Sequence, residues 1–266
     1  MFSQGEFPCK ASPVTLGHEF SGVVTEVGSE VTHIKVGDKV AVDPNVGCRC
    51  CPPCAAGDYH LCSGSCKDIP VGIHGDGGWA RFCKVRSDIV FRLPDSVSLE
   101  QGALTEPISC LSHGWDRVAP IPMGSEILIT GAGIIGVLWA SILHLMGYRR
   151  IIVSEPIEAR RKLVEELGLD IESVNPMDLV ERKNKNPEWG VNVAIDCSGN
   201  TRAIEGACDL LRPGGKLVIF GVSSPAARIS LSPFKIYKNE LTILGVLVNP
   251  FSFPKAIGFI ESLGDK

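Results

Sequence analysis

The apolar residues of this chain follow two different patterns along its length. From Leu16 to Leu93, short β-branched runs alternate with Gly, Asp and Pro, as in SGVVTEVG, HIKVGDKVAVDP, ARFCKV and DIVFRLP. Runs of this kind, bounded by turn residues and without a helical period, are typical of β-strands. This part of the chain is therefore predicted to form a compact β domain, which a cysteine-rich stretch interrupts.

The segment from Ser98 to Val118 changes to helix-forming residues. It starts with SLEQ, which places Gln101 three residues after Ser98 and resembles a capping box at a helix start. We expect this segment to connect the β domain to the rest of the chain.

After Gly124 the pattern becomes a strand followed by a helix, several times over. The predicted strands are the apolar runs EILIT, RIIVS, VNVAID, KLVIFGV and LTILGV. Helices are predicted after the first run through Gly147, over 157–167 and over 202–211. Continuous apolar strands alternating with helices indicate a parallel sheet covered on both faces. The predicted fold class is α/β, with a β domain followed by a doubly wound parallel sheet.

One stretch has the composition of a membrane-spanning helix, because residues 127–148 contain no Asp, Glu, Lys or Arg. Three glycines near its start divide it into a strand-length run and a helix-length run, so a spanning helix is disfavoured and no membrane association is expected. The formal net charge of −4 offers no broad attraction to nucleic acid either. The first residues lack the basic and apolar regions of a secretion signal, and we expect a cytoplasmic protein.

Five of the eleven cysteines lie in the stretch GCRCCPPCAAGDYHLC, residues 47–62. Two-residue gaps let a turning backbone present successive thiolates to one ion, and a longer last gap lets a fourth close a tetrahedron. Four thiolates favour a structural zinc, whereas an iron–sulfur cluster, a redox pair or unligated thiols are the alternatives. The spacing C-x2-C-x2-C-x7-C selects Cys48, Cys51, Cys54 and Cys62, and leaves out Cys50.

A glycine-rich motif, GAGIIG at residues 131–136, follows the predicted strand EILIT and opens a helix. In a dinucleotide-binding turn the first glycine permits the tight bend, the second lets the backbone approach a pyrophosphate, and the third allows close packing. The helix N-terminus then faces the phosphates. The residues expected to contact the cofactor here are Gly131, Gly133, Ile135 and Gly136.

An acidic residue, Glu155, stands 22 residues after Gly133 at the end of RIIVS. A carboxylate there accepts hydrogen bonds from the adenosine ribose and favours NAD over NADP. The nearby Arg160 and Arg161 leave NADP open. Alternatively, the carboxylate only caps the following helix. Further cofactor contacts are expected where VNVAI and KLVIF end, from Ser198, Gly199 and Val222.

The sequence Gly17-His18-Glu19, followed by Gly22 and Gly28, reads G-H-E-x2-G-x5-G. Together with the cysteine lobe and the glycine motif, in that order, it resembles the zinc-dependent medium-chain alcohol and polyol dehydrogenases over essentially the whole chain. The resemblance implies an active-site zinc. It also implies a homo-oligomer, a dimer or tetramer, with LTILGVLV as a candidate edge strand through which subunits pair. It implies three regions: a GroES-like catalytic domain over 1–118, a Rossmann NAD-binding domain over 119–248, and the start of a return segment over 249–266.

By this resemblance His18 is a catalytic zinc ligand, Glu19 is a ligand or a close carboxylate, and Glu106 binds zinc directly or through its water. The segment Thr105-Glu106-Pro107-Ile108 is similar to that of sorbitol- and arabinitol-type enzymes, which favours hydride transfer from a polyol to NAD. Cys110 is the competing ligand in the same segment. Singly, these residues could also be a half-buried histidine, a surface acid and a helix first-turn acid. The alternative functions are a simple-alcohol or threonine-type dehydrogenase, or a non-catalytic form that binds zinc and a dinucleotide.

The family pattern also contains features that this chain does not show. It places a further zinc-ligating cysteine, in a C-G-x-D-like motif, before Gly17, and Cys9 lacks that context. It continues beyond Lys266 with strands and a helix. The chain is therefore expected to be an internal portion of such an enzyme, which keeps the structural zinc and dinucleotide binding but has weak or no turnover.

Overall fold

The computed structural model describes residues 13–62 and 70–264 of the chain, which divides into two compact units. The first unit combines Met1–His113 with Leu247–Lys266, and the second is Gly114–Val246. The chain thus leaves the first unit once and returns to it near its end. Cys9, considered above as a ligand, lies outside the described residues.

The described part of the first unit contains one three-stranded antiparallel sheet in the order β1-β2-β3. Val42, Val71 and Ile89 form its small core, against which Phe20 packs. Three of the predicted runs contribute these strands, which are β1 (Ser21–Val23), β2 (Lys39–Val42) and β3 (Val90–Arg92).

The remaining predicted run of this unit, ARFCKV, is a wrong prediction. Residues 80–85 form no strand, and Phe82, the largest apolar side chain among them, is 65% exposed. Its alternating residues Cys83 and Val85 are half-buried and pack against the small core, yet the run does not pair as a strand. Local alternation alone therefore did not decide strand formation here.

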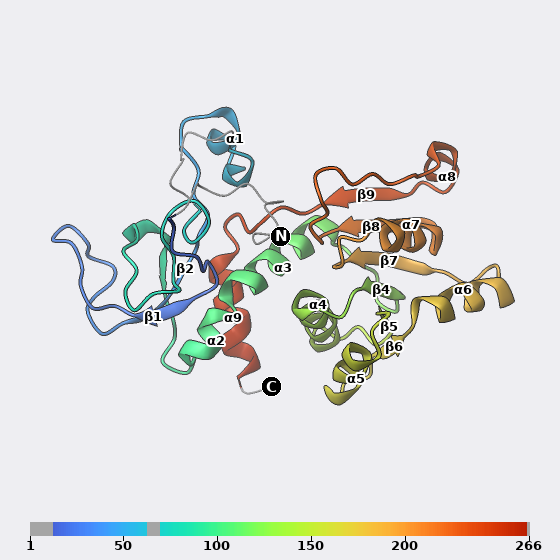
Figure 1. Ribbon diagram of the computed structural model, residues 1–266, viewed down its shortest axis with the longest axis horizontal. Coiled ribbons are helices and arrows are strands. Elements are labelled where there is room, and N and C mark those ends of the chain that lie inside the picture. Colours follow the sequence, from blue (N-terminus) through green and yellow to red (C-terminus); the bar gives the residue numbers. More distant parts are fainter. Residues whose placement is uncertain (1–12, 63–69, 265–266) are drawn as a thin grey trace. The chain divides into compact units, whose positions relative to one another are not determined.

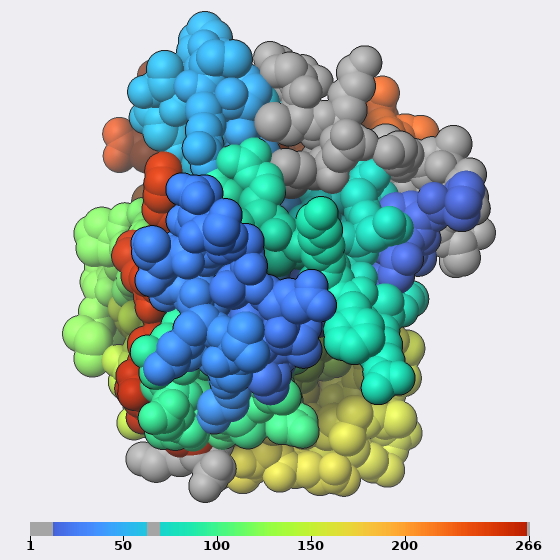
Figure 2. Space-filling model, turned by 90° about the vertical axis from the view of Figure 1, so that its left-hand side faces the viewer, coloured from blue at the N-terminus to red at the C-terminus, as the bar shows by residue number. Residues whose placement is uncertain are grey.

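The α-helices of the first unit lie in the cysteine lobe, in the connecting segment and near the end of the chain (Figure 1). In Figure 2 the light-blue lobe forms a separate mass at the top of the view. Ser98 and Gln101 make the predicted capping box, which is confirmed. The elements are α1 (Pro52–Ala55), η2 (Tyr59–Leu61), η3 (Ser87–Ile89), α2 (Leu99–Ala103), α3 (Thr105–Val118), which runs on into the second unit, and α9 (Phe253–Leu263).

Helix α9 was not predicted from the sequence, although its pattern was visible there. Its buried residues recur at positions i, i+3, i+4 and i+7, which gives one apolar face. They are Phe253, Ala256, Ile257 and Ile260.

The second unit is built on a six-stranded parallel sheet in the order β6-β5-β4-β7-β8-β9. The order reverses beside β4, as in a doubly wound fold, and this confirms the predicted α/β class. The strands are β4 (Ile127–Thr130), β5 (Ile151–Ser154), β6 (Glu172–Val174), β7 (Val191–Asp196), β8 (Leu211–Ile219) and β9 (Thr242–Gly245).

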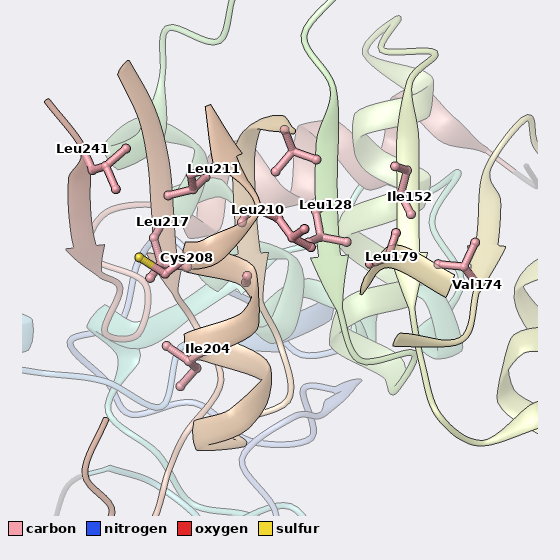
Figure 3. Packing of buried hydrophobic residues seen from close by; sticks show 13 residues of the cluster. Leu128, Ile152, Val174, Leu179, Ile204, Cys208, Leu210, Leu211, Leu217 and Leu241 are labelled. Carbon is pink, nitrogen blue, oxygen red and sulfur yellow. The ribbon is translucent and has the colours of Figure 1, made fainter. Parts of the chain in front are cut away.

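Helices cover both faces of this sheet, with α4 and α5 on one side and α6 and α7 on the other (Figure 1). On the second side Leu179 of α6 and Ile204 of α7 pack against Leu128, Ile152 and Leu217 of the strands (Figure 3). The helices are α4 (Ile134–Leu145), α5 (Glu158–Glu166), α6 (Pro176–Lys185), α7 (Thr201–Asp209) and α8 (Pro233–Lys238).

Two details of this unit differ from the prediction. Strand β6 and helix α6 were missed, because α6 is polar and buries only Leu179; the Asn175 capping box and Pro176 were the available signals. The helix predicted over 202–211 ends at Asp209, because Leu211 already pairs with Val191 in the sheet.

The apolar stretch 127–148 contains β4 and the 12-residue helix α4. Throughout the described residues, every helix is too short or too polar for a membrane crossing.

Candidate metal and dinucleotide sites

Four thiols of the cysteine lobe come together at distances that suit one ion. The Sγ atoms of Cys48 and Cys54 are 3.9 Å apart and those of Cys51 and Cys62 are 3.8 Å apart. All four sulfurs lie within 4.8 Å of one another. Zn–S bonds of about 2.3 Å in a tetrahedron separate the sulfurs by about 3.8 Å, so this group fits zinc. Cys50 is exposed, with its Sγ 3.5 Å from that of Cys48, and it lies outside the group.

The backbone of the lobe is arranged around these sulfurs. The N–H of Cys51 donates to Cys48 Sγ at 3.3 Å, and the N–H of Cys48 donates to Cys62 Sγ at 3.4 Å. A Cβ at Gly47 would stand 2.4 Å from Cys54 Sγ, so only glycine fits there. Burial, with the neighbouring thiols, raises the pKa of Cys54 to about 12. A dication would reverse this effect, because it favours the thiolate.

A second group in the same unit consists of His18, Glu19 and Glu106, whose ligand atoms all lie within 4.8 Å of one another. His18 and Glu19 precede β1, and Glu106 lies in the first turn of α3. Gly17 has φ +103°, and a Cβ there would lie 2.3 Å from Trp79 Cδ1. Glycine at this position therefore allows the turn that presents the next two side chains.

The electrostatics of this second group favour a bound cation. Glu106 is only 6% exposed, and burial raises its pKa to about 8, with further contributions from the charges of Glu19 and Asp43. Burial also lowers the pKa of His18, against the opposing charge of Glu19. A dication stabilises a buried carboxylate and a neutral imidazole, and one nitrogen with two carboxylates is a donor set that zinc accepts. The residues present thus fit a zinc ion.

Cys110, the competing ligand candidate, lies one helical turn after Glu106. Its Sγ donates a hydrogen bond to Glu106 Oε1 at 3.6 Å, and burial raises the pKa of the thiol well above its usual value. It is not among the three residues whose ligand atoms are grouped. The structure thus places this thiol beside Glu106 and outside the group of three.

The glycine motif forms the turn between β4 and α4 in the second unit. Gly131 has φ +97°, and Gly133 is the N-cap of α4. A Cβ at Gly136 would lie 1.9 Å from Gly131 O, whereas a Cβ at Gly133 would meet nothing within 4 Å. Ile135 is half-buried in the first turn of the helix. The turn thus leaves open space at the helix N-terminus, where a phosphate can approach the backbone.

Glu155 follows β5 and is 3% exposed. Its Oε2 accepts a hydrogen bond from Ala132 N at 2.9 Å, and its Oε1 accepts one from Ile157 N at 3.0 Å. It therefore ties the glycine turn to the start of α5. Arg160 Nη1 lies 3.9 Å from this carboxylate, while Arg161 donates to backbone carbonyls, including that of Glu155 at 2.8 Å. Arg160 is therefore the arginine that faces Glu155.

Asp196 anchors the turn after β7, a role that the sequence reasoning missed. It is fully buried, and its carboxylate accepts hydrogen bonds from Thr130 Oγ1 at 2.8 Å, Ser198 Oγ at 2.6 Å and Gly199 N at 3.0 Å. A Cβ at Gly199 would lie 2.3 Å from Val222 O. Ser198, Gly199 and Val222 therefore meet at the carboxyl ends of β7 and β8. An Asp followed by Ser and Gly two and three residues later was the available signal.

Comparison with known proteins shows the family of the chain. The family model "Alcohol dehydrogenase GroES-like domain" matches residues 1–95, and the model "Zinc-binding dehydrogenase" matches residues 135–262. D-arabinitol dehydrogenase 1 of Uromyces fabae is 31% identical over 97% of this chain and 74% of its own length. The chain belongs to the zinc-dependent alcohol and polyol dehydrogenase family. Sorbitol dehydrogenase of Bacillus subtilis (strain 168) is 37% identical to this dehydrogenase over 94% of the chain and 70% of its own length.

Solved structures resemble the dehydrogenase along nearly its whole length. A zinc-binding dehydrogenase of Sinorhizobium meliloti 1021, bound to NADP, has a TM-score of 0.89 at 36% identity and covers 98% of this chain and 76% of its own. An alcohol dehydrogenase of Escherichia coli CFT073, in complex with NADH, has a TM-score of 0.86 at 26% identity, with coverages of 97% and 75%.

Proposed function

We propose that this dehydrogenase transfers a hydride from a secondary alcohol of a polyol of the sorbitol, iditol, xylitol or arabinitol kind to NAD, giving the ketose. The observation that carries this proposal is the group of His18, Glu19 and the buried Glu106. A carboxylate instead of a thiolate in this group matches the family's polyol enzymes, and the relatives named above act on D-arabinitol and sorbitol.

In this proposal His18, Glu19 and Glu106 hold the catalytic zinc. A zinc ion held there would supply the positive charge that lowers the pKa of an alcohol. Glu106, buried in the first turn of α3, would contribute one carboxylate to the ion. The thiols of Cys48, Cys51, Cys54 and Cys62 hold a structural zinc that orders the lobe.

The second unit would bind the dinucleotide. Its pyrophosphate would lie against the turn of Gly131, Gly133 and Gly136 at the N-terminus of α4, next to Ile135. Glu155 would accept hydrogen bonds from the ribose, which favours NAD, while Arg160 is the residue through which NADP could bind. Ser198, Gly199 and Val222 would contact the cofactor at the sheet edge.

The remaining expectations belong to this proposal as well. The chain would form a catalytic domain over 1–118, a Rossmann domain over 119–248 and a return segment from 249. The protein would be a cytoplasmic homo-oligomer. β9 lies at the edge of the sheet and is a candidate for pairing between subunits. Sedimentation of wild-type protein would show a dimer or tetramer if this is right.

A substrate comparison tests the proposed reaction. NAD reduction is measured with sorbitol, xylitol, arabinitol, ethanol and threonine, on protein whose zinc content is known. We expect any turnover to be selective for the polyols. A selective response to threonine or ethanol would replace the polyol by one of those substrates, and NADH binding without turnover of any of the five would indicate a non-catalytic protein.

A further inference from the structure

A buried polar network in the first unit centres on Asn249, which is 0% exposed. Its Oδ1 accepts a hydrogen bond from Asn45 Nδ2 at 2.8 Å. Its Nδ2 donates to Ser109 Oγ at 2.8 Å and to Asp43 Oδ1 at 3.3 Å. All of the amide's hydrogens are therefore used, on residues from two distant segments.

Ser109 connects this amide to the candidate metal site. Its hydroxyl donates to Glu106 O at 2.6 Å and is itself fully buried. Because a hydroxyl has one hydrogen, it must accept the bond from Asn249. The direction of both hydrogen bonds is thus determined. Asn249 is connected through two successive hydrogen bonds to the backbone carbonyl of Glu106.

The same network also reaches the cysteine lobe. Tyr59 lies between Cys54 and Cys62 in sequence, and its hydroxyl is 3.4 Å from Asp43 Oδ2. That hydroxyl also accepts a hydrogen bond from Phe251 N at 3.0 Å. The lobe, the return segment and α3 are therefore linked through one set of hydrogen-bonded polar groups, with Asn249, Asp43 and Ser109 as its buried members.

The return segment around Asn249 has an unusual backbone. Val248 has φ +44° and Phe251 has φ +54°. Positive φ is unfavourable for a β-branched or aromatic residue and persists only where surrounding contacts enforce it. The three hydrogen bonds of the buried Asn249 amide provide such contacts. Backbone strain of this kind occurs mainly at functional sites.

We propose that Asn249 is a positioning residue for the metal group of His18, Glu19 and Glu106. Acting through Ser109, it fixes the first turn of α3 and so the direction from which Glu106 reaches the ion. This inference rests on the proposed function, because it assumes that the group binds a metal. Loss of partners that orient a ligand typically lowers metal affinity about 10- to 100-fold.

Cobalt(II) titration tests this role, because it reports on the two metal groups separately. Cobalt at the four cysteines gives a thiolate-to-metal charge-transfer band, whereas cobalt at His18, Glu19 and Glu106 gives only weak d–d bands. For Asn249→Ala we expect cobalt affinity at the second group to fall about tenfold or more, with the charge-transfer titration unchanged. Ser109→Ala removes only a hydroxyl and should act in the same way. The double variant should lose no more than the larger single loss, because both residues act along one path.

Tyr148→Phe is the matched control. It removes a buried hydroxyl that donates to Ile121 O at 2.8 Å in the second unit, and it should change neither cobalt signal. Unchanged affinity in both network variants, an equal weakening of both metal groups, or additive losses in the double variant would overturn the positioning role. If the wild type itself shows no thiolate-free cobalt site, the proposed function and this inference fall together. If it binds cobalt there and oxidises polyols while both variants behave as wild type, only the inference falls.

Discussion

The carboxylate of Glu155 accepts a hydrogen bond from the backbone N–H of Ala132 at 2.9 Å, across 23 residues of sequence. This bond joins the end of β5 to the turn that follows β4. A second bond, from Ile157 N at 3.0 Å, uses the other carboxylate oxygen. The Glu155 side chain therefore holds the glycine turn in place and also lies where the cofactor ribose is expected.

Glu155→Gln should weaken both the fold and NAD binding. An amide has one acceptor oxygen, so one of the two backbone N–H groups loses its partner, at a cost of about 1–3 kcal/mol in unfolding free energy. NADH affinity, followed by quenching of tryptophan fluorescence, should fall about tenfold, which is about 1.4 kcal/mol, while NADPH affinity falls less. Glu158→Gln, at an exposed position paired with Lys162, is the control and should leave both affinities unchanged. Equal losses for the two cofactors would remove Glu155 from cofactor selection.

Two glycine variants should separate folding from binding. Gly136→Ala places a methyl 1.9 Å from Gly131 O, and the forced backbone shift should cost about 1–3 kcal/mol in unfolding free energy. Gly133→Ala meets no atom within 4 Å at φ −74°, so its cost to the fold should be about 0.5 kcal/mol. Its methyl nevertheless takes up space that the pyrophosphate needs, and NADH titration should show a loss of about tenfold or more. Undiminished NADH binding by Gly133→Ala would place the phosphates elsewhere.

Cysteine variants should identify the structural zinc ligands. Cys54→Ser removes one of the four grouped sulfurs, so zinc content by mass spectrometry should fall by about one ion per chain. The lobe should then unfold, since a structural site of this kind depends on its metal, and limited proteolysis should cut within residues 47–62. Cys50→Ser, outside the group, should keep its zinc and resist the protease. The reverse result for these two variants would mean that Cys50 is a ligand.

Asp43 should make stability depend on pH. Burial raises the pKa of this carboxyl from 3.8 to about 6, so folding favours its protonated form and the ionised form is destabilising. The destabilisation is absent below pH 3.8, grows as the pH rises and is complete above pH 6, where it reaches about 3 kcal/mol. Asp43→Asn keeps an acceptor for Asn45 and Asn249, and it should gain stability relative to wild type between pH 4 and pH 7.

Chemical denaturation at a series of pH values measures this difference. Asp95→Asn, at an exposed position, is the control and should parallel the wild type. A constant gap between Asp43→Asn and wild type across the range would show that Asp43 titrates normally.

Features that depend on neighbouring residues could be read from the sequence. The alternation of apolar strands and helices predicted the parallel sheet, and Ser98 with Gln101 predicted the cap of α2. The glycine motif predicted its turn, because Gly131 and Gly136 are only five residues apart and their backbones lie in close contact. The gaps between the cysteines likewise limit where four thiols can point.

Other features depend on segments far apart in the chain. Run ARFCKV has a strand pattern and packs Cys83 and Val85 against the core, but it does not pair with the described sheet. Helix α6 has little apolar pattern but is held by packing of Leu179. Asn249 forms hydrogen bonds with Asp43, 206 residues away in sequence, and with Ser109, 140 residues away. No local sequence pattern predicts either bond.

Local features could be predicted and long-range contacts could not, for a physical reason. Turn formation, capping and ligand spacing are set by backbone geometry over a few residues, so the sequence alone determined the glycine turn, the cap of α2 and the spacing of the four cysteines. The surroundings of Glu106 are a matter of burial and of charges brought in from elsewhere, which raise its pKa to about 8. Only the tertiary structure decided that this carboxylate is buried next to His18 and Glu19, because desolvation depends on everything that packs around a group.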